Sequence, residues 1–153
     1  SLPDEVRRRG LPSPDIAISP DGQTIACVVR RTVLLWPFSA FTQNQPPRQM
    51  QISGENRSTC SNLSFSPDGR YLGVACSDGG VRLLNPQTLA LKKTITVHKY
   101  GVNDLAFSQD GKRLATASIH NFHISPVDFA DLLNVARRLQ ARRTEETTSI
   151  APR

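Results

Sequence analysis

Short apolar runs alternate with tight polar turns through most of the chain. Three of these runs read apolar–small–apolar, at residues 16–18, 63–65 and 105–107, and each leads through a turn into a second run of strand length. The second runs are built from Ile, Leu, Val and small residues. Runs of this length and composition between turn residues are typical of β-strands, so the pattern predicts three β-hairpins.

The three turns share one sequence pattern. Residues 19–22 and 66–69 read Ser-Pro-Asp-Gly and residues 108–111 read Ser-Gln-Asp-Gly, with starts 47 and 42 residues apart. Proline sets φ at a turn corner, aspartate bonds to nearby backbone amides, and glycine accepts a positive φ. The pattern indicates an internal repeat of one hairpin-containing unit.

Each unit has room for about four strands. A third run follows the hairpin at residues 32–36, 81–85 and 122–124. A fourth candidate follows a polar or proline-containing linker at residues 48–52 and 91–97. Units of four short strands with a period of roughly 40–45 residues are typical of β-propeller blades. We therefore expect an all-β fold, a partial β-propeller of about three four-stranded antiparallel blades at residues 16–52, 63–97 and 105–125.

The third unit carries the clearest motif. His98 and Val102 precede the run Asp-Leu-Ala-Phe-Ser at residues 104–108, and the turn is followed by Leu-Ala-Thr-Ala-Ser at residues 114–118. This arrangement resembles the WD-repeat (Trp-Asp repeat) β-propeller family, and the resemblance covers residues 16 to about 125. A similar Ser-Pro-Asp-Gly turn also occurs in the propellers of peptidases and periplasmic translocation proteins.

In the WD-repeat family, a His, a Ser or Thr, an Asp and a Trp often form a hydrogen-bonded set within a blade. The resemblance assigns such structural roles to His98, Thr116, Asp78 and Trp36. No unit carries all four residue types, and Asn121, next to His120, stands near the position of the expected Asp in the third unit. We expect apolar packing to hold these blades together more than the polar set.

The segment after Ser125 changes to a helical period. Pro126 fits the first helical position, and an apolar stripe follows at Phe129, Leu132, Leu133, Val135, Ala136 and Leu139. We predict an amphipathic helix at residues 126–143 and a flexible tail at residues 144–153. Residues 1–15 are expected to be a remnant or outer strand of a preceding blade.

The C-terminal segment resembles the tail of bacterial multi-domain proteins in which WD repeats follow a signal-transducing NTPase, a kinase or a protease domain. This resemblance implies a cytoplasmic bacterial protein with an effector domain outside this sequence. Residue 1 is Ser, and we expect a processed or excised piece. Three blades leave two open faces and unpaired edges, so we expect the remaining blades or another copy of the chain to cover them.

Composition narrows the class of protein further. The 153 residues suffice for one ordinary domain, and the net charge of +6 permits contact with nucleic acid or an anionic membrane without demanding it. No apolar run approaches the ~18 residues of a spanning helix. Cys27, Cys60 and Cys76 form no Cys-x-x-Cys pair, and we expect them to be buried, reduced thiols of a cytosolic protein.

Candidate catalytic and metal sites are absent from the sequence pattern. There is no Gly-x-Ser-x-Gly, Walker-type glycine loop or His-Glu-x-x-His motif. His120 and His123 fall in a turn and a strand, which disfavours a shared zinc site. The three turn aspartates belong to separate turns, whereas calcium needs several converging oxygens. We expect no catalytic residue, no metal and no cofactor.

We therefore expect a non-catalytic platform for protein interaction or sensing within a larger signalling protein. On the family's pattern, the binding rim is supplied by Arg30, Arg31, Glu55, Arg57, Ser77, Asp78, Lys99, Tyr100 and His120. Its net basic character favours a partner with an acidic surface, and Arg and Tyr are common carriers of interface energy. Two alternatives remain: a peptidase-type propeller that gates a catalytic domain elsewhere, and a basic nucleic-acid-binding module.

Overall fold

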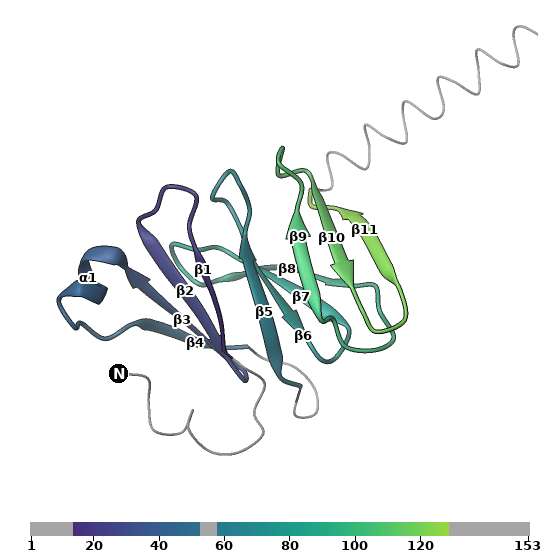
Figure 1. Cartoon of the computed structure of the whole chain (residues 1–153), viewed down its shortest axis with the longest axis horizontal. Helices are drawn as coiled ribbons and strands as arrows, with labels where there is room; N and C mark the ends of the chain where they lie inside the picture. The colour runs from purple at the N-terminus through teal and green to yellow at the C-terminus, as the bar shows by residue number, and fades with distance from the viewer. Residues whose placement is uncertain (1–13, 53–57, 129–153) are drawn as a thin grey trace, which may run out of the picture.

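Three antiparallel β-sheets stand side by side in the computed structural model, which describes residues 14–52 and 58–128 (Figure 1). We call them blades 1, 2 and 3. Blade 1 holds β1 (Asp15–Ile18), β2 (Thr24–Val29), β3 (Thr32–Pro37) and β4 (Arg48–Gln51). Blade 2 holds β5 (Cys60–Phe65), β6 (Leu72–Cys76), β7 (Gly80–Leu84) and β8 (Leu91–Thr96). Blade 3 holds β9 (Asp104–Phe107), β10 (Arg113–Ala117) and β11 (Phe122–Pro126).

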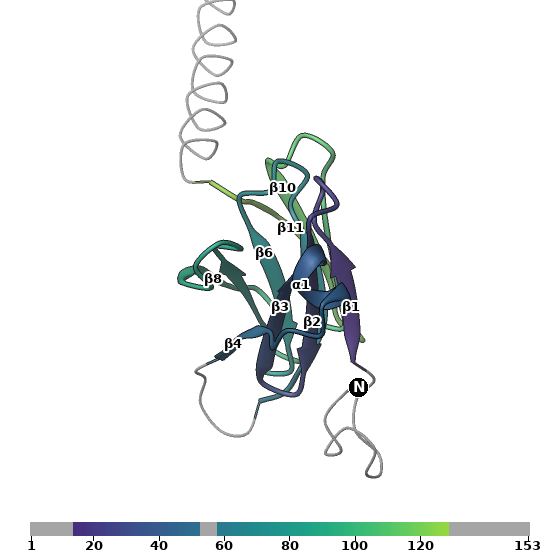
Figure 2. The same ribbon diagram turned by 90° about the vertical axis from the view of Figure 1, so that its left-hand side faces the viewer.

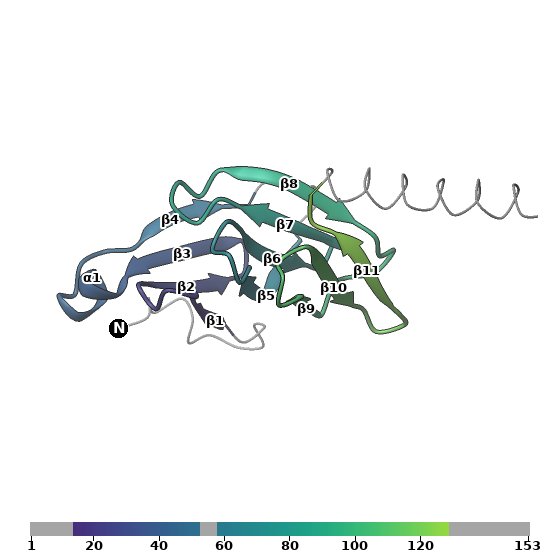
Figure 3. The same cartoon turned by 90° about the horizontal axis from the view of Figure 1, so that it is seen from above.

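Each blade is a meander in which strands pair in sequence order. The first strands β1, β5 and β9 follow one another along one edge of the assembly, and β4 and β8 lie along the opposite edge (Figure 3). The prediction of an all-β architecture with successive antiparallel sheets is confirmed. Blade 3 has three strands in the part of the chain that the structure describes, whereas blades 1 and 2 have four.

One local element was not predicted, and one prediction is wrong. The linker between β3 and β4 contains a short helix, α1 (Phe38–Thr42), which contacts β3 and is visible at the near end of the molecule in Figure 2. The predicted helix does not begin at Pro126, because Pro126 ends β11 and pairs with Arg113 of β10. Proline is tolerated at the end of an edge strand as well as at a helix start, so the sequence signal was ambiguous. The rest of that helix, the tail and the N-terminal segment lie outside the described residues.

The three repeated turns have the same internal hydrogen bonds, and they stand at the top of Figure 1. In each turn the serine hydroxyl donates to the aspartate carboxylate at 2.5–2.6 Å, and the amide two residues beyond the aspartate donates to the same carboxylate. The serine hydroxyl and then this amide lower the pKa of Asp21 and of Asp110. Gly22, Gly69 and Gly111 take φ values of 68–71°, which glycine adopts without strain.

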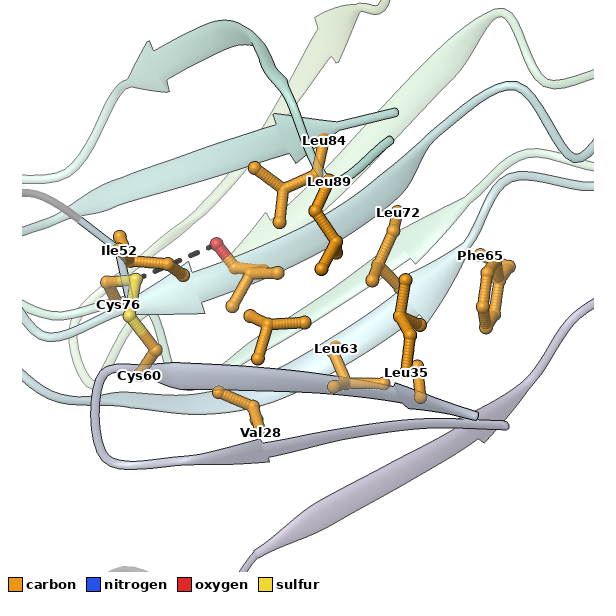
Figure 4. Close-up of a cluster of buried hydrophobic side chains, with 13 residues drawn as sticks. Val28, Leu35, Ile52, Cys60, Leu63, Phe65, Leu72, Cys76, Leu84 and Leu89 are labelled. Atoms are coloured by element: carbon orange, nitrogen blue, oxygen red, sulfur yellow. Dashed lines mark hydrogen bonds between the residues drawn. A yellow bond between two sulfur atoms is a disulfide. The ribbon is translucent and has the colours of Figure 1, made fainter. Parts of the chain in front are cut away.

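The core consists of two apolar layers between the blades. The first lies between blades 1 and 2 and includes Val28, Leu35, Leu63 and Leu72 (Figure 4). The second lies between blades 2 and 3 and includes Val81, Leu83, Leu105 and Leu114. Burying one such side chain contributes roughly 1.5–3 kcal/mol. Blade 2 is therefore covered on both faces, whereas blades 1 and 3 each have a neighbour on one face only within the described residues.

Cys60 and Cys76 are joined by a disulfide, which corrects the expectation of three reduced thiols (Figure 4). The two residues face each other across β5 and β6, and both are buried. Their separation of 16 residues carried no signal in the sequence, because only the strand register brings them together. Cys27 keeps its thiol, and burial together with the Asp15 carboxylate raises its pKa.

No helix in the described part of the chain has the length and hydropathy that crossing a bilayer needs.

The disulfide predicts a thiol count. The chain has three cysteines, so protein purified without reductant and then denatured should expose one thiol per chain to Ellman's reagent, that of Cys27. Reduction before the assay should raise the count to three. A count of three without reduction would contradict the Cys60–Cys76 bond. A Cys27→Ser variant is the control, since without reduction it should expose no thiol.

Candidate functional site

One end of the blades gathers the turns between second and third strands and the segments that enter the first strands. We call this end the rim, made up of residues 30–31, 58–60, 77–79, 98–101 and 118–121. Backbone hydrogen bonds join these segments in sequence around the rim. The Cys60 amide donates to the Arg30 carbonyl, and the Ser77 amide donates to the Thr59 carbonyl. The rim is therefore a connected surface rather than a set of independent loops.

Most of the predicted rim residues lie on this surface. Six of them are exposed there: Arg30, Ser77, Asp78, Lys99, Tyr100 and His120. Arg31 is half-buried, and its guanidinium donates to the Ile52 carbonyl at 3.1 Å. Glu55 and Arg57 lie outside the described residues.

The rim carries an exposed aromatic contact between blades 2 and 3. The rings of Tyr100 and His120 meet edge to face with centroids 4.9 Å apart. The Lys99 ammonium lies 5.9 Å from the centre of the Tyr100 ring. Ile119, beside His120, is 68% exposed. We call these four residues the rim patch. It offers apolar area, an aromatic ring and a positive charge at one place, a combination suited to protein contacts.

Beneath the rim patch, His98 makes the polar contacts that the resemblance implied, with one substitution. Its ring nitrogens lie 2.8 Å from the Thr116 hydroxyl and 2.7 Å from the Asn121 side-chain oxygen. Because an amide oxygen only accepts, Nδ1 of His98 carries a proton and donates to Asn121. The Thr116 hydroxyl, beside Nε2, also donates to the His123 carbonyl at 3.4 Å. Asn121 thus takes the position of the expected Asp, so an uncharged amide stands where the family often has a carboxylate. It fixes the segment that leads to Tyr100 against the turn that holds His120.

Asp78 lies at the equivalent turn of blade 2 but has another partner. The guanidinium of Arg82, four residues later, makes a bidentate ion pair with its carboxylate, and the Gly80 amide donates to the same group at 3.1 Å. These bonds from Arg82 are the main cause that lowers the pKa of Asp78. Arg82 is buried, so the pair is desolvated on one side and rigid. Asp78 therefore stiffens the rim and has little carboxylate left for a partner.

The fourth structural candidate, Trp36, lies in β3 opposite Ile25. It is half-buried, on the face of blade 1 turned away from blade 2. It is the only tryptophan in the sequence, and it is not at the rim.

Sequence reasoning missed the contacts by which four side chains join neighbouring blades. Arg48 of β4 donates to the Pro86 and Gln87 carbonyls of blade 2, and Lys93 of β8 donates to the Val127 carbonyl at 3.1 Å. Tyr71 of blade 2 donates to Asp128, beyond β11, at 2.8 Å, and Arg70 pairs with the same carboxylate. Tyr71 and then Arg70 lower the pKa of Asp128. Such contacts have no local sequence signal, because the acceptors are carbonyls or side chains of another blade.

Residues 14–52 and 58–128 contain no candidate metal site. No group of three or more His, Cys, Asp and Glu side chains there could hold a metal ion.

The chain matches a family model described as the WD domain, G-beta repeat, at residues 48–85 and 89–122. The first segment runs from β4 to β7, and the second runs from β8 to the first residue of β11. Each matched repeat therefore begins with the outer strand of one blade and continues into the next blade. Because of this offset, each repeat contributes strands to two consecutive blades.

Curated relatives match parts of the chain. A WD repeat-containing protein of Dictyostelium discoideum is 34% identical over 86 residues, which cover 54% of this chain and 15% of the relative. The COMPASS component SWD3 of Saccharomyces cerevisiae is 28% identical over 112 residues, 73% of this chain and 34% of the relative. The chain thus spans about a third or less of the length of these relatives.

Solved structures have the same fold. Structures of U3-55K and of the RRP9 WD40 repeats superpose with a TM-score of 0.67 and 18% identity. Each superposition covers 80% of this chain, and 38% and 37% of the respective solved chains. At this identity the likeness concerns the fold.

The close packing of the rim around Gly79 can be tested by substitution. A Cβ atom there would lie 2.0 Å from the His98 carbonyl oxygen, and φ is +84°. Gly22 has a similar φ of +71° but open space around the Cβ position, so it is a matched control. We expect Gly22→Ala to lower the free energy of unfolding by about 1–2 kcal/mol, from backbone strain alone. Gly79→Ala should cost about 3 kcal/mol or more in urea denaturation.

Equal costs for the two variants would contradict the close approach of the β6–β7 turn to the segment at His98.

Proposed function

We propose that this chain, two segments of which match the WD-repeat model, belongs to that β-propeller family and that its rim is a protein-binding platform. WD repeat domains are generally non-catalytic scaffolds for protein interactions. The observation that carries the proposal for this chain is the rim patch. The segments that carry the exposed Tyr100 and His120 rings are joined by the hydrogen bonds of His98 to Thr116 and Asn121, so the two rings are positioned before any partner arrives. Preordered side chains lose little conformational entropy on binding.

The charge of the rim favours an acidic partner surface. Arg30 and Lys99 are exposed, whereas the carboxylate of Asp78 is already paired with Arg82. The chain as a whole carries a net charge of +6. Complementary charge would accelerate association and fix the orientation of the partner, and apolar contact with Tyr100 and Ile119 would supply affinity.

We also propose that this chain is part of a longer propeller. Ile16 and Ile18 of blade 1 are 66% and 61% exposed, on the face turned away from blade 2. Phe122 and Ile124 of blade 3 are also exposed, on the opposite end of the array. Faces of this composition suit further blades, either from the same protein or from another copy. The greater length of the relatives is consistent with this arrangement.

A signalling role in the cytoplasm of a bacterium stays a proposal that rests on the resemblance of the C-terminal segment. The Cys60–Cys76 disulfide weighs against a reducing compartment, because structural disulfides persist mainly in oxidising ones. The thiol count proposed above, made on protein isolated from its own cells under alkylating conditions, bears directly on this point.

The platform can be tested by comparing what three forms of the chain capture from extracts of the source cells. The first is the unchanged chain, and the second is a rim variant, Lys99→Glu with Tyr100→Ala. The third is a control, Lys112→Glu, which reverses an exposed charge at the repeated turn of blade 3, away from the rim. We expect a defined set of proteins to bind the unchanged chain and the control, and to be lost from the rim variant.

Circular dichroism should show that all three forms are equally folded, since the changed side chains are exposed. Equal capture by the rim variant and the unchanged chain would exclude the rim patch as the binding surface. Loss from the control alone would move the site to the opposite end of the blades.

A further inference from the structure

The two strands of the β5–β6 hairpin are held together by different means at their two ends. At the repeated turn, the Gly69 amide donates to the Ser66 carbonyl and the Tyr71 amide donates to the Ser66 hydroxyl. At the rim, the Cys60–Cys76 disulfide joins the strands. The third cysteine of the chain keeps its thiol, so blades 1 and 3 have no equivalent bond. The rim end of blade 2 therefore depends on a bond that a redox reaction breaks or forms.

The disulfide adjoins the hydrogen bonds that link blades 1 and 2 at the rim. The Cys60 amide donates to the Arg30 carbonyl of blade 1. The Thr59 amide donates to the Ser77 hydroxyl at 2.9 Å, and the Ser77 amide donates to the Thr59 carbonyl at 2.8 Å. Thr59 precedes one cysteine and Ser77 follows the other. Residues 59–60 thus bridge the β2–β3 turn of blade 1 and the β6–β7 turn of blade 2.

Cys60 is set apart from the rest of β5 by an irregularity in the strand. The pairing of β5 with β6 is regular from Asn62 to Phe65, and the register shifts between Cys60 and Asn62. Such a bulge interrupts the backbone hydrogen bonds locally and allows the strand to bend. From Asn62 onward, β5 is therefore held by the sheet. Beyond the bulge it is held by the disulfide and by the hydrogen bonds of Thr59 and Cys60.

Reduction increases the space that the two sulfur atoms need. Bonded sulfur atoms lie about 2 Å apart, whereas heavy atoms in nonbonded contact lie roughly 3.5–4 Å apart. Cys60 and Cys76 are 1% and 0% exposed, in the apolar layer that also holds Val28 and Ile52 (Figure 4). A close-packed layer leaves no room for this increase, so one strand end must move. The bulge makes residues 58–60 the segment that moves.

The reaction is a balanced thiol–disulfide exchange. A thiolate of a dithiol reductant attacks one of the two sulfur atoms, the S–S bond breaks, and a mixed disulfide forms. The second thiol of the reductant then attacks the mixed disulfide and releases the protein. Two electrons and two protons have then passed to the two cysteines, and the reductant has become a disulfide. A small disulfide such as oxidised glutathione reverses the reaction.

We propose that the Cys60–Cys76 pair is a redox switch of the rim. In the oxidised form, residues 58–60 are fixed against the β6–β7 turn, and their bond to the Arg30 carbonyl sets the position of that turn relative to the rim patch. In the reduced form, residues 58–60 separate from Ser77 and this link between blades 1 and 2 is lost. The inference rests on the proposed function, in which Arg30 contributes to the binding surface. Disulfides in reducing compartments are usually transient, which suits a switch.

Amide hydrogen exchange of the full chain, followed by NMR, tests whether the response is confined to the rim. The oxidised protein is compared with protein reduced by dithiothreitol. We expect the amides of Thr59, Cys60 and Ser77 to exchange about tenfold or more faster after reduction, because their acceptors move away. The Gly69 and Tyr71 amides, at the other end of the same hairpin, are internal controls and should change little.

Two variants separate the bond from other effects of the reductant. Without any reductant, Cys60→Ala combined with Cys76→Ala should show the fast exchange at Thr59 and Ser77, and dithiothreitol should not change it further. Cys27→Ala is the matched control, because Cys27 is buried but takes no part in the bond. It should respond to dithiothreitol as the unchanged chain does.

A switch also requires the bond to equilibrate with cellular thiols. The full chain is incubated in mixtures of reduced and oxidised glutathione, alkylated, and analysed by intact mass. We expect the bonded fraction to fall from nearly complete to nearly zero as the reduced form increases across these mixtures. A bond that persists in a large excess of reduced glutathione is a permanent cross-link and would overturn the proposal.

The exchange measurement has two outcomes that count against the switch. Faster exchange at Gly69 and Tyr71 as well as at the rim would show that the bond supports the whole hairpin. Unchanged exchange at Thr59 and Ser77 would show that the rim does not depend on it. None of these experiments uses a binding partner, so their failure is distinct from a failure of the capture experiment on the rim patch.

Discussion

Every blade of this protein depends on its neighbour, because a small antiparallel sheet has two faces and water can cover only one of them without cost. Blade 2 meets this requirement on both sides: Leu63 and Leu72 pack toward blade 1, and Val81 and Leu83 toward blade 3. Apolar layers of this kind provide most of the stability of repeat architectures. Ile16 at one end and Phe122 at the other are exposed, because the outer faces of blades 1 and 3 have no neighbouring blade within the described residues.

Polar contacts fix the position of the rim at one end of the packed blades. His98, Thr116 and Asn121 fix one inter-blade junction under Tyr100 and His120, while Asp78 and Arg82 stiffen the turn next to it. Basic residues of the outer strands bind carbonyls of the next blade, which ties the sheets together at the edge far from β1 and β5. The result is a rigid support with exposed side chains at one end, the usual arrangement of a binding surface built on loops.

The parts of this structure that could be predicted from the sequence are those with local causes. The repeated turns are stabilised by local hydrogen bonds of their serine and aspartate, so the hairpins and their period could be predicted from the sequence. The Cys60–Cys76 bond depends on register across β5 and β6, which includes a bulge between Cys60 and Asn62. Pro126 suited both a helix start and a strand end, and packing of the adjacent Val127 decided between them. Rim residues could be placed by their turns, but the Tyr100–His120 contact needed the two blades side by side.

The stacking of blades is tested most directly at Gly73, where blade 2 packs closely against blade 3. Gly73 of β6 leaves room for blade 3, since a Cβ there would lie 3.1 Å from the Leu105 methyl carbon and 3.2 Å from the Phe107 ring. Nuclear Overhauser spectra of the full chain should therefore show strong contacts from the Gly73 α protons to the Leu105 methyl groups and the Phe107 ring. If assigned spectra show β6 and β9 without any contact between them, the blades do not stack and the account is wrong.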